Sequence, residues 1–504
     1  MILQTVRKIS CFSLFIPALF AAESALYTVE NNVSPWYDRV GQWVVVDLPE
    51  LYVGKTIVPL QGCSSRSLVL PAGTKKAIIA IAKGDLAKMK SRISDIVETG
   101  LECRVTTPAG KNPIPYVILE YLNPPEKSEF KNFSAGLILL SLDPPLVMPE
   151  KKALPSSPAL KESAKSEVQG AQRRQGVLAV EETIEGQSWQ FSPGPREIKL
   201  HVKEPSAGIG PETGIMLVLH NWGGLYNSPE YISWCKIFAD RYDVVAVSVN
   251  YLQSGSNRKG GPYDHGYLQA MDAIRAVHSI WSQLKEKKVS FNENRIYSMG
   301  ESGGGNVSQM AAKLAPRTFA CIVDICGMPG LTDGIAFGTG EYGSHLNAGY
   351  SRDPNSPFYL SKAMQEIRDF GNPAHCEIVH KLNPNLKIVI AHGVDDRSCP
   401  VVHKITQFRS MVDTGIDVDG HFLTKFDVDG AAVTTTGHPV GNRAQVVIKY
   451  ADVYLSPTGK FAAQTKTGPD FGKSSVVYPV TGGKYIVDYS SLPEIRFDAD
   501  PALR

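Results

Sequence analysis

Short runs of apolar and β-branched residues recur between turn residues in the first part of the chain. The runs are QWVVVDLP (42–49), KTIVPL (55–60), RSLVLP (66–71), KKAIIAIA (75–82), PYVILEYL (115–122) and AGLILLSL (135–142). Runs of this length, bounded by Gly, Pro and Asn, are typical of β-strands. One stretch, 85–98, repeats its apolar residues at helical spacing. We therefore expect a small strand-rich domain over 26–148, either a β-sandwich or an α+β module.

The next segment, 149–176, has almost no large apolar residues. Pro, Ser, Lys, Glu, Ala and Gln dominate it. A segment of this composition cannot bury enough apolar surface to offset the conformational entropy that folding removes. We expect a disordered linker here, open to proteolysis, between two domains.

Beyond the linker the apolar residues fall into continuous runs. Ile198, Leu200 and Val202 first alternate with polar residues, which predicts an antiparallel edge strand. The continuous runs are IMLVL (215–219), VVAVSV (244–249), RIYSM (295–299), ACIVDI (320–325) and KIVIA (387–391). Helical stretches lie between them, near 229–240, 266–285, 303–314, 358–368, 401–413 and 442–455. This alternation predicts an α/β domain over 177–456 with a doubly wound, mostly parallel sheet. The remaining segment, 457–504, is a C-terminal extension with one strand-like run, KYIVDY.

The first residues resemble an export signal. Arg7 and Lys8 precede an apolar run, 9–22, and small residues follow it. This order of a basic start, a short apolar block and a small-residue zone is typical of a signal peptide, here 1–25. The alternative is a buried N-terminal helix. We expect a secreted or periplasmic protein with no transmembrane segment in the mature chain, because no later run approaches the ~20 apolar residues that span a bilayer.

Charge and cysteine content exclude several classes of protein. Lys and Arg together number 52 against 50 Asp and Glu, so no basic excess indicates a nucleic-acid partner. Removal of 1–25 leaves seven of the eight cysteines, an odd number at scattered spacings that match no disulfide framework or zinc site. Cys321 and Cys326 lie in an apolar run and are expected to be buried thiols. A bridge between Cys63 and Cys103 stays open. We expect no metal and no cofactor.

The strongest motif follows the run RIYSM directly. Gly300-Glu301-Ser302-Gly303-Gly304 is a G-x-S-x-G sequence, and an amphipathic helical stretch comes after it. The motif needs this context of strand, tight turn and helix, because the turn exposes the serine and the helix start points free N–H groups at developing negative charge. The alternative is a Gly-rich loop without chemistry. We predict that Ser302 is a nucleophile.

With this motif the chain resembles the serine α/β-hydrolase superfamily, nearest to its esterase and prolyl-oligopeptidase-like members. It is also similar to a bacterial family within that superfamily, through VSVNY (247–251), GYLQAMDAI (266–274), SPFYLS (356–361), the D-D-x-x-x-P sequence at 395–400 and the late Gly437-His438 pair. The resemblance covers roughly 190–456. It implies the α/β-hydrolase fold for that region.

The resemblance also implies an oxyanion hole with two backbone donors. One is the N–H of Gly303, and the other comes from the loop after IMLVL, which reads His220-Asn221-Trp222-Gly223-Gly224. The loop resembles the His-Gly-x motif of the superfamily, with Asn221 where glycine is usual. We predict the N–H of Trp222 as the second donor. The alternative is a plain Gly-Gly turn with a packed tryptophan. His220 is expected to orient the loop rather than act as a base.

The superfamily order Ser, Asp, His assigns the acid and the base. The loop after KIVIA resembles the His-Gly-x-x-Asp loop of the superfamily, which selects Asp396, with Asp395 as the alternative. His438 lies in a glycine-flanked loop before the last helical stretch, so we predict it as the base. His421 is the alternative, and His403 follows the acid too closely to lie in a separate loop.

The resemblance and the predicted export together indicate an exported carboxylic-ester hydrolase with an acyl-enzyme intermediate. An acylated carbohydrate is one substrate class that fits. The alternatives are a prolyl-oligopeptidase-like peptidase and a catalytically silent binding protein on the same fold. The segment 328–357, rich in Gly, Tyr, Asn and Ser, is expected to shape or cover the pocket. No substrate-binding residue is assigned from the sequence.

Overall fold

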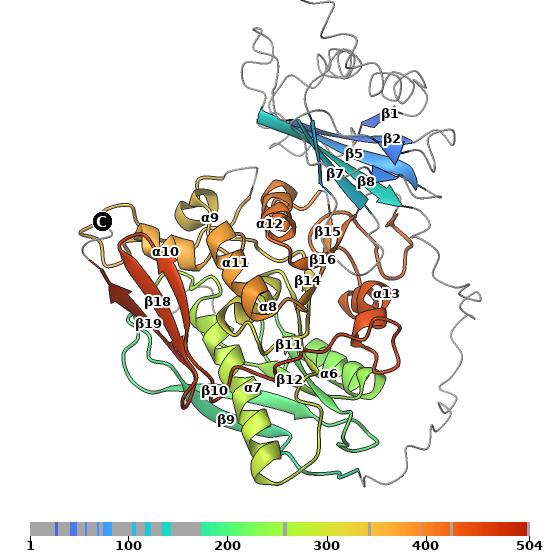
Figure 1. Ribbon diagram of the computed structural model, residues 1–504. Helices are drawn as coiled ribbons and strands as arrows, with labels where there is room; N and C mark the ends of the chain where they lie inside the picture. Colours follow the sequence, from blue (N-terminus) through green and yellow to red (C-terminus); the bar gives the residue numbers. More distant parts are fainter. Residues whose placement is uncertain are drawn as a thin grey trace, which may run out of the picture. The chain divides into compact units, whose positions relative to one another are not determined.

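The chain forms two compact units, 1–167 and 168–504. The computed structural model describes residues 173–255, 260–340, 344–393, 395–423 and 427–500, together with the backbone of eight strands between 26 and 142 (Figure 1). The predicted signal peptide, the predicted helix at 85–98 and the side chains of Cys63 and Cys103 lie outside the described part.

The strands of the first unit form a small antiparallel sheet. Its order is β1-β2-β5-β8-β7-β6. The strands are β1 (Leu26–Thr28), β2 (Gly41–Asp47), β5 (Thr74–Ala82), β6 (Cys103–Thr106), β7 (Tyr116–Tyr121) and β8 (Ser134–Leu142). A separate pair consists of β3 (Thr56–Ile57) and β4 (Leu68–Val69). All six predicted apolar runs of this region therefore contribute a strand.

The second unit is built on one eight-stranded sheet with the order β16-β15-β14-β13-β11-β12-β10-β9. Its strands are β9 (Glu181–Gly186), β10 (Arg196–Lys203), β11 (Gly214–Leu219), β12 (Val244–Val249), β13 (Ile296–Glu301), β14 (Cys321–Ile325), β15 (Lys387–Gly393) and β16 (Asp417–Leu423). The six strands β11–β16 pair in parallel, and β9 and β10 join them antiparallel. This is the α/β-hydrolase fold that the sequence predicts.

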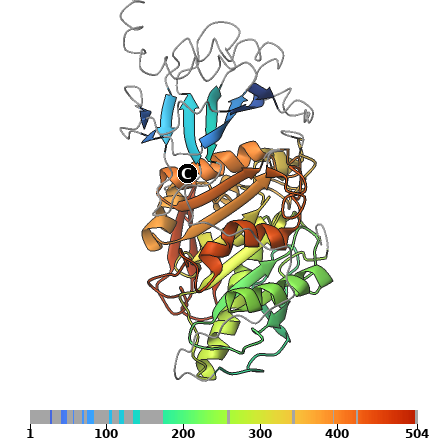
Figure 2. The same cartoon turned by 90° about the vertical axis from the view of Figure 1, so that its right-hand side faces the viewer.

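Helices cover both faces of this sheet, which explains its continuous apolar strands. α6 (Pro229–Tyr242, green) and α13 (Arg443–Leu455, orange-red) lie over one face of the sheet (Figure 2). Their buried residues share one core with those of the strands. α7 (Leu268–Glu286) and α8 (Gly303–Leu314) contact each other and the central strands, and α12 (Val401–Asp413) contacts β15 and β16. Every residue of β11, β12, β13, β14 and β15 is buried. The sheet is therefore a rigid support for loops at its carboxyl edge.

Three features differ from the sequence prediction. β10 is not an edge strand, because the charged strand β9 pairs with its outer side. Two short helices, α9 (Asp333–Phe337) and α11 (Pro373–Leu382), lie where none is predicted, and the helix predicted at 358–368 is α10 (Lys362–Ile367). Apolar and polar residues alternate in β10 because one face of the strand is buried. An inner antiparallel strand near the margin of a sheet shows the same pattern as an edge strand.

The C-terminal extension packs onto the second unit as a three-stranded antiparallel sheet. Its strands are β17 (Val476–Val480), β18 (Gly483–Asp488) and β19 (Glu494–Ala499). The hydroxyls of the buried Tyr478 and Tyr489 donate to the carbonyls of Lys313 and Leu314 at the end of α8. The extension is thus part of the same core. Only KYIVDY, in β18, was predicted.

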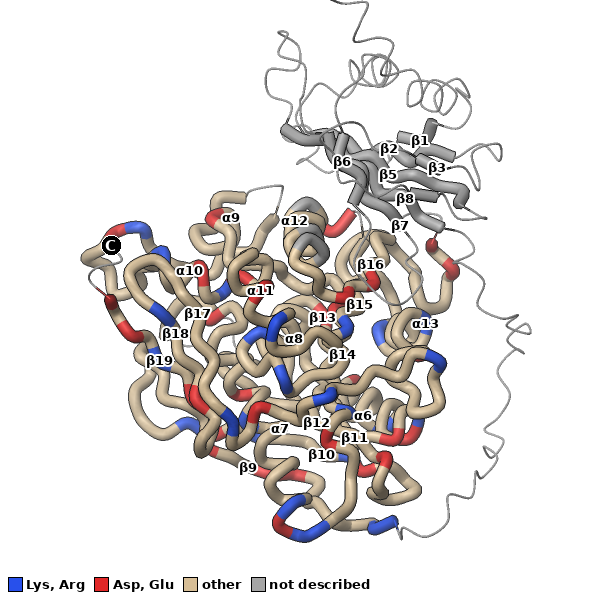
Figure 3. Tube along the Cα trace, in the orientation of Figure 1, with Lys and Arg blue, Asp and Glu red and all other residues tan. Residues whose placement is uncertain are grey.

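In the described part of the second unit, Lys and Arg positions are interspersed with Asp and Glu positions along the chain trace (Figure 3). Among the described residues, no helix has the length and apolarity that crossing a membrane requires.

Candidate active site

Strand β13 passes into helix α8 through a single residue, Ser302. Its backbone has φ 52° and ψ −117°, a conformation that residues with a side chain rarely adopt. The flanking glycines permit this turn, because a Cβ on Gly300 would lie 2.2 Å from the backbone of Gly304. A Cβ on Gly304 would lie 2.3 Å from the carbonyl oxygen of Leu219. The G-x-S-x-G motif therefore forms the strained strand–helix corner that the sequence predicts.

Backbone hydrogen bonds hold this corner to the neighbouring strand. The N–H of Ser302 donates to the carbonyl of Ile325 at 2.9 Å, at the end of β14. The carbonyl of Ser302 accepts from Asn306 at 3.1 Å and from Met328 at 3.4 Å. Ser302 is 9% exposed. The serine is thus fixed at the carboxyl edge of the sheet, where parallel α/β sheets place their chemistry.

The structure brings Asp396 and His438 together. Nδ1 of His438 lies 2.8 Å from Oδ2 of Asp396, in the loop after β15. Oδ1 of the fully buried Asp396 accepts the N–H of Cys399 at 2.8 Å. A carboxylate at Nδ1 selects the tautomer in which Nδ1 carries the proton and Nε2 is free to accept one. Arg443 links the histidine loop to the corner: its Nη1 donates to the carbonyl of Gly441 at 2.9 Å, and its Nε lies 2.7 Å from Oε2 of Glu301, the residue before Ser302.

The alternative residues have other partners. The side chain of Asp395 accepts the hydroxyl of Thr436. His421 lies on β16, with Nε2 3.1 Å from Oδ1 of Asp419 and its ring stacked on Tyr450. His403 lies on α12 and lines a cavity together with Gly330 and Gln365. In these contacts, none of the three alternative residues takes the place of Asp396 or His438 in the pair.

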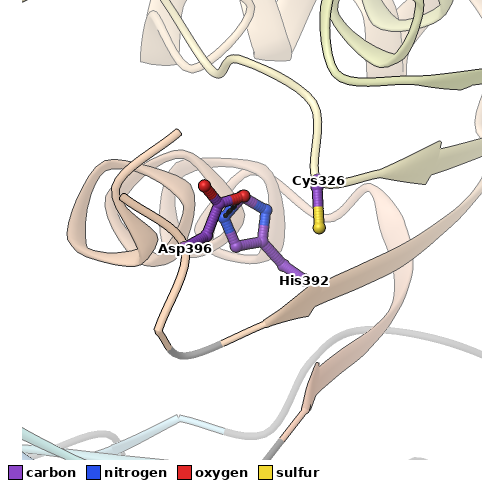
Figure 4. Close-up of side chains that lie close together, drawn as sticks. All are labelled: Cys326, His392 and Asp396. Carbon is purple, nitrogen blue, oxygen red and sulfur yellow. Dashed lines mark ion pairs between the residues drawn. The ribbon is translucent and has the colours of Figure 1, made fainter. Parts of the chain in front are cut away.

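A second imidazole lies behind Asp396. Figure 4 shows His392 between Asp396 and Cys326, with all three side chains fully buried. Nε2 of His392 is 2.7 Å from the carbonyl of Cys399 and 3.6 Å from Oδ2 of Asp396. Burial lowers the pKa of His392 and raises the pKa of the Cys326 thiol well above its usual range. A neutral imidazole and a neutral thiol are therefore expected there, and His392 supports the acid loop.

These side chains also form two groups with metal-ligand atoms close together. Cys326, His392 and Asp396 have such atoms within 4.8 Å of one another, and so do Asp396, Cys399 and His438. Asp396 belongs to both groups, and its two oxygens already accept bonds from Cys399 and His438. The carboxylate is thus engaged by protein donors, and the neutral thiol of Cys326 is not in the thiolate form that binds metals.

The predicted oxyanion donors are close neighbours. A Cβ built on Gly303 would lie 2.9 Å from the backbone nitrogen of Trp222, so the two residues meet side by side. Gly303 is the first residue of α8, where backbone N–H groups have no intrahelical acceptor. Within the described ranges, no acceptor engages the N–H of Gly303 or of Trp222. Both remain available to an oxygen atom beside Ser302.

The side chain of His220 holds the loop that carries Trp222. The ring of His220 lies 2.8 Å from the carbonyl of Asn221 and 2.7 Å from the hydroxyl of Ser254, and it stacks on Tyr251. Burial lowers the pKa of His220 to about 4, so the ring is neutral at pH 7. This geometry suits a residue that orients the loop.

The segment after β14 packs beside Trp222. The ring of Tyr263 stacks on Trp222 with centroids 3.7 Å apart, and both join an apolar cluster with Met328, Leu331 and Ala348. The backbone N–H of Tyr263 donates to the carbonyl of Ala348 at 2.7 Å. Ser344 donates to the carbonyl of Ser398 in the acid loop at 2.9 Å. The described part of 328–357 therefore lies against both the oxyanion loop and the acid loop.

Three residues near the corner were not singled out from the sequence. They are Tyr231, Glu301 and Arg443, and Glu301 contacts each of the other two in the structure. Glu301 is the variable residue of G-x-S-x-G and follows a buried apolar strand, so a charge there was a signal that a partner must lie nearby. Tyr231 and Arg443 come from distant helices and carry no local pattern.

The chain is similar to one family model and to several solved structures. Residues 257–455 match a family model described as "Protein of unknown function (DUF2920)". Comparison with curated protein sequences gives no match. Similar solved structures include a putative carboxylesterase from Lactobacillus plantarum WCFS1, at 14% identity over 53% of this chain and 95% of that chain, with a TM-score of 0.35.

Two further structures are similar over about half of the chain. Brefeldin A esterase, a bacterial homologue of human hormone sensitive lipase, is 18% identical over 49% of this chain and 70% of that chain, with a TM-score of 0.34. Dipeptidyl peptidase 4 of Porphyromonas gingivalis is 14% identical over 49% of this chain, with a TM-score of 0.35. The match covers 32% of the peptidase.

Proposed function

We propose that the chain is a serine hydrolase that cleaves carboxylic esters through Ser302, His438 and Asp396. The observation that carries the proposal is the 2.8 Å contact between Nδ1 of His438 and the buried Asp396, in the loops that follow β15 and precede α13. A hydroxyl at a strand–helix corner needs a base and an orienting carboxylate to become a nucleophile. All three are present in the chain order of the fold.

In the acylation step, Nε2 of His438 takes the hydroxyl proton of Ser302 as Oγ bonds to the acyl carbon. The carbonyl oxygen becomes an oxyanion, and Asp396 stabilises the imidazolium. The tetrahedral intermediate then collapses. The bond to the leaving alcohol breaks, and Nε2 returns its proton to the alcohol oxygen. A water molecule repeats the sequence on the acyl-enzyme and releases the acid.

The oxyanion is bound by the N–H groups of Gly303 and Trp222. Preorganised donors of this kind cost no reorganisation during the reaction, and loss of one donor costs about 3 kcal/mol of transition-state stabilisation. The start of α8 adds its partial positive charge.

A covalent probe and two matched histidine variants test the proposal. A fluorophosphonate is expected to label the wild type at Ser302 and to leave Ser302→Ala unlabelled. Turnover of p-nitrophenyl acetate is expected to fall by about 10³-fold or more in Ser302→Ala and His438→Ala. His421→Ala is the control and should stay within about twofold of the wild type. Unchanged turnover in both Ser302→Ala and His438→Ala contradicts the proposal.

The ester preference is separated from peptidase activity by a substrate panel. Acyl esters of increasing chain length and acetylated sugars are compared with prolyl amides at equal enzyme concentration. The proposal expects the highest kcat/KM on an ester. A higher kcat/KM on a prolyl amide would assign a prolyl-oligopeptidase-like peptidase instead.

Export is a second part of the proposal and rests on the basic start and apolar run of 1–25. N-terminal sequencing of the protein purified from its native host tests it. A mature N-terminus near residue 26 is expected, and an intact residue 1 on the purified protein would contradict it.

A further inference from the structure

The nucleophile corner has a buried carboxylate immediately before the serine. The side chain of Glu301 is 2% exposed and ends β13. A charge in that position needs partners, because an unpaired buried carboxylate is strongly unfavourable. Glu301 finds two, one on each side of the proposed site.

The first partner leads to the oxyanion loop. The hydroxyl of Tyr231, on α6, donates to Oε1 of Glu301 at 2.9 Å. The same hydroxyl oxygen accepts the N–H of Asn221 at 3.1 Å. Asn221 directly precedes Trp222, the proposed oxyanion donor. The position of that donor is thus linked through one hydroxyl to Glu301.

The second partner leads to the histidine loop. Nε of Arg443, at the start of α13, forms an ion pair with Oε2 of Glu301 at 2.7 Å, without the N–H geometry of a hydrogen bond. Nη1 of Arg443 donates to the carbonyl of Gly441 at 2.9 Å, three residues after His438. The guanidinium also lies 5.5 Å from the ring centroid of Trp234 on α6, a cation–π distance. Its other carboxylate partner, Glu230, is 46% exposed on the outer side.

We propose that Glu301 is a positioning residue, which holds the oxyanion loop through Tyr231 and the histidine loop through Arg443 at fixed places relative to Ser302. The inference rests on the proposed function. Misplacing a reacting group by about 1 Å can cost about 100-fold in rate, so such a link acts mainly on kcat.

The test compares Glu301→Gln with Glu230→Gln. Both remove one carboxylate partner of Arg443, but only Glu301 is linked to both loops. With p-nitrophenyl acetate, Glu301→Gln is expected to lower kcat by about 10- to 100-fold with KM within about twofold. Glu230→Gln should keep both constants within about twofold. Activities are divided by the folded fraction, measured by near-UV circular dichroism.

A second variant isolates the oxyanion arm and stays informative if Glu301→Gln folds poorly. Tyr231→Phe keeps the ring and removes the hydroxyl that joins Asn221 to Glu301. It should lower kcat about tenfold. It should also weaken inhibition by a trifluoromethyl ketone by a similar factor, because the adduct of this inhibitor with Ser302 carries an oxyanion. In the double variant the two losses should not multiply, because both remove the same link.

The outcomes separate the inference from the function it rests on. If Ser302→Ala is inactive while Glu301→Gln and Tyr231→Phe match Glu230→Gln, the serine mechanism stands and the positioning role is wrong. Losses that multiply in the double variant, or that equal the loss of folded protein, also overturn the role. Turnover that survives Ser302→Ala overturns the proposed function itself.

Discussion

Two adjacent carboxylates in the loop after β15 have different partners. Asp396 is fully buried and accepts His438 and the N–H of Cys399, whereas Asp395 bonds to Thr436. The N–H of Asp395 also donates to the carbonyl of Thr436 at 3.0 Å. One carboxylate therefore faces the proposed base, and its neighbour joins the acid loop to the histidine loop.

This difference gives a residue-scale prediction. Asp396→Asn keeps the shape of the side chain but presents an amide to Nδ1, which favours the wrong tautomer of His438. We expect kcat/KM for p-nitrophenyl acetate to fall by about 10³- to 10⁴-fold. Asp395→Asn is the matched control and should lose less than about tenfold, because it only weakens a loop contact. Equal losses in the two variants would show that Asp395 shares the role of the acid.

Single residues were predictable from sequence where a local pattern limits the choice. Ser302 and Gly303 follow from a motif placed between an apolar strand and a helix. The motif resemblance selected Asp396 over Asp395, and the contact to His438 is what distinguishes them in space. Tyr231 could not be found this way, because its link to Glu301 depends on how α6 packs on the sheet, and no local spacing records that packing.

At the scale of elements, the buried parallel strands were the most predictable part. β12 has the predicted bounds, and β11, β13, β14 and β15 differ from them by one or two residues, since two-sided burial requires continuous apolar sequence. β9 was missed because its sequence, EETIEG, has one large apolar residue and little reason to be a strand except its pairing with β10. The pairing of β9 with β10, rather than the sequence of β9 itself, therefore makes this segment a strand.

The attachment of the C-terminal sheet gives an element-scale prediction. The fully buried Asp470 accepts the backbone N–H of Arg317 at 2.8 Å, its guanidinium at 2.7 Å and the hydroxyl of Thr318 at 2.9 Å. Asp470→Ala leaves these donors unpaired and should lower the free energy of unfolding by about 3–5 kcal/mol. Urea unfolding measures this change in the free energy of unfolding. Asp498→Ala, on an exposed pair of the same sheet, is the control and should change it by less than about 1 kcal/mol. Similar losses in both would contradict this account.

A buried lysine on α8 gives a prediction about pH. Lys313 is fully buried and donates to the carbonyls of Ile367 and Asp369 at 2.8 and 2.7 Å. Burial lowers its pKa from 10.5 to about 7. Between these two values the unfolded chain binds a proton that the folded chain does not, so the contribution of Lys313 to stability increases as pH rises. It is fully present above 10.5 and is lost as the pH falls through about 7.

Lys313→Met tests this contribution. Urea unfolding of both proteins between about pH 7.5 and 9.5 should give a more positive slope of unfolding free energy against pH in the wild type than in the variant. The difference in slope removes the effect of other titrating groups. Parallel slopes would show that Lys313 keeps its proton in the folded state.

At the scale of the whole molecule, the proposed site lies entirely within one compact unit, 168–504. Two arginines attach the start of that unit to its core. Arg173 makes two hydrogen bonds to Asp243 at 2.8 and 2.9 Å, and the N–H of Arg174 donates to the carbonyl of Ile209 at 2.9 Å. A protease needs to bind its substrate as an extended strand, so residues in such contacts are protected. The lysines before them lie in the segment that composition predicts to be a linker.

Limited trypsin digestion should therefore cut after Lys151, Lys152, Lys161 or Lys165 before it cuts after Arg173 or Arg174. Mass spectrometry of the large product should show an N-terminus between 152 and 166. Because every residue of the proposed site lies in this product, its kcat/KM for p-nitrophenyl acetate should stay within about twofold of the intact chain. Undigested protein incubated without trypsin is the control. A well-folded product that has lost its activity would mean that residues before the cut contribute to catalysis.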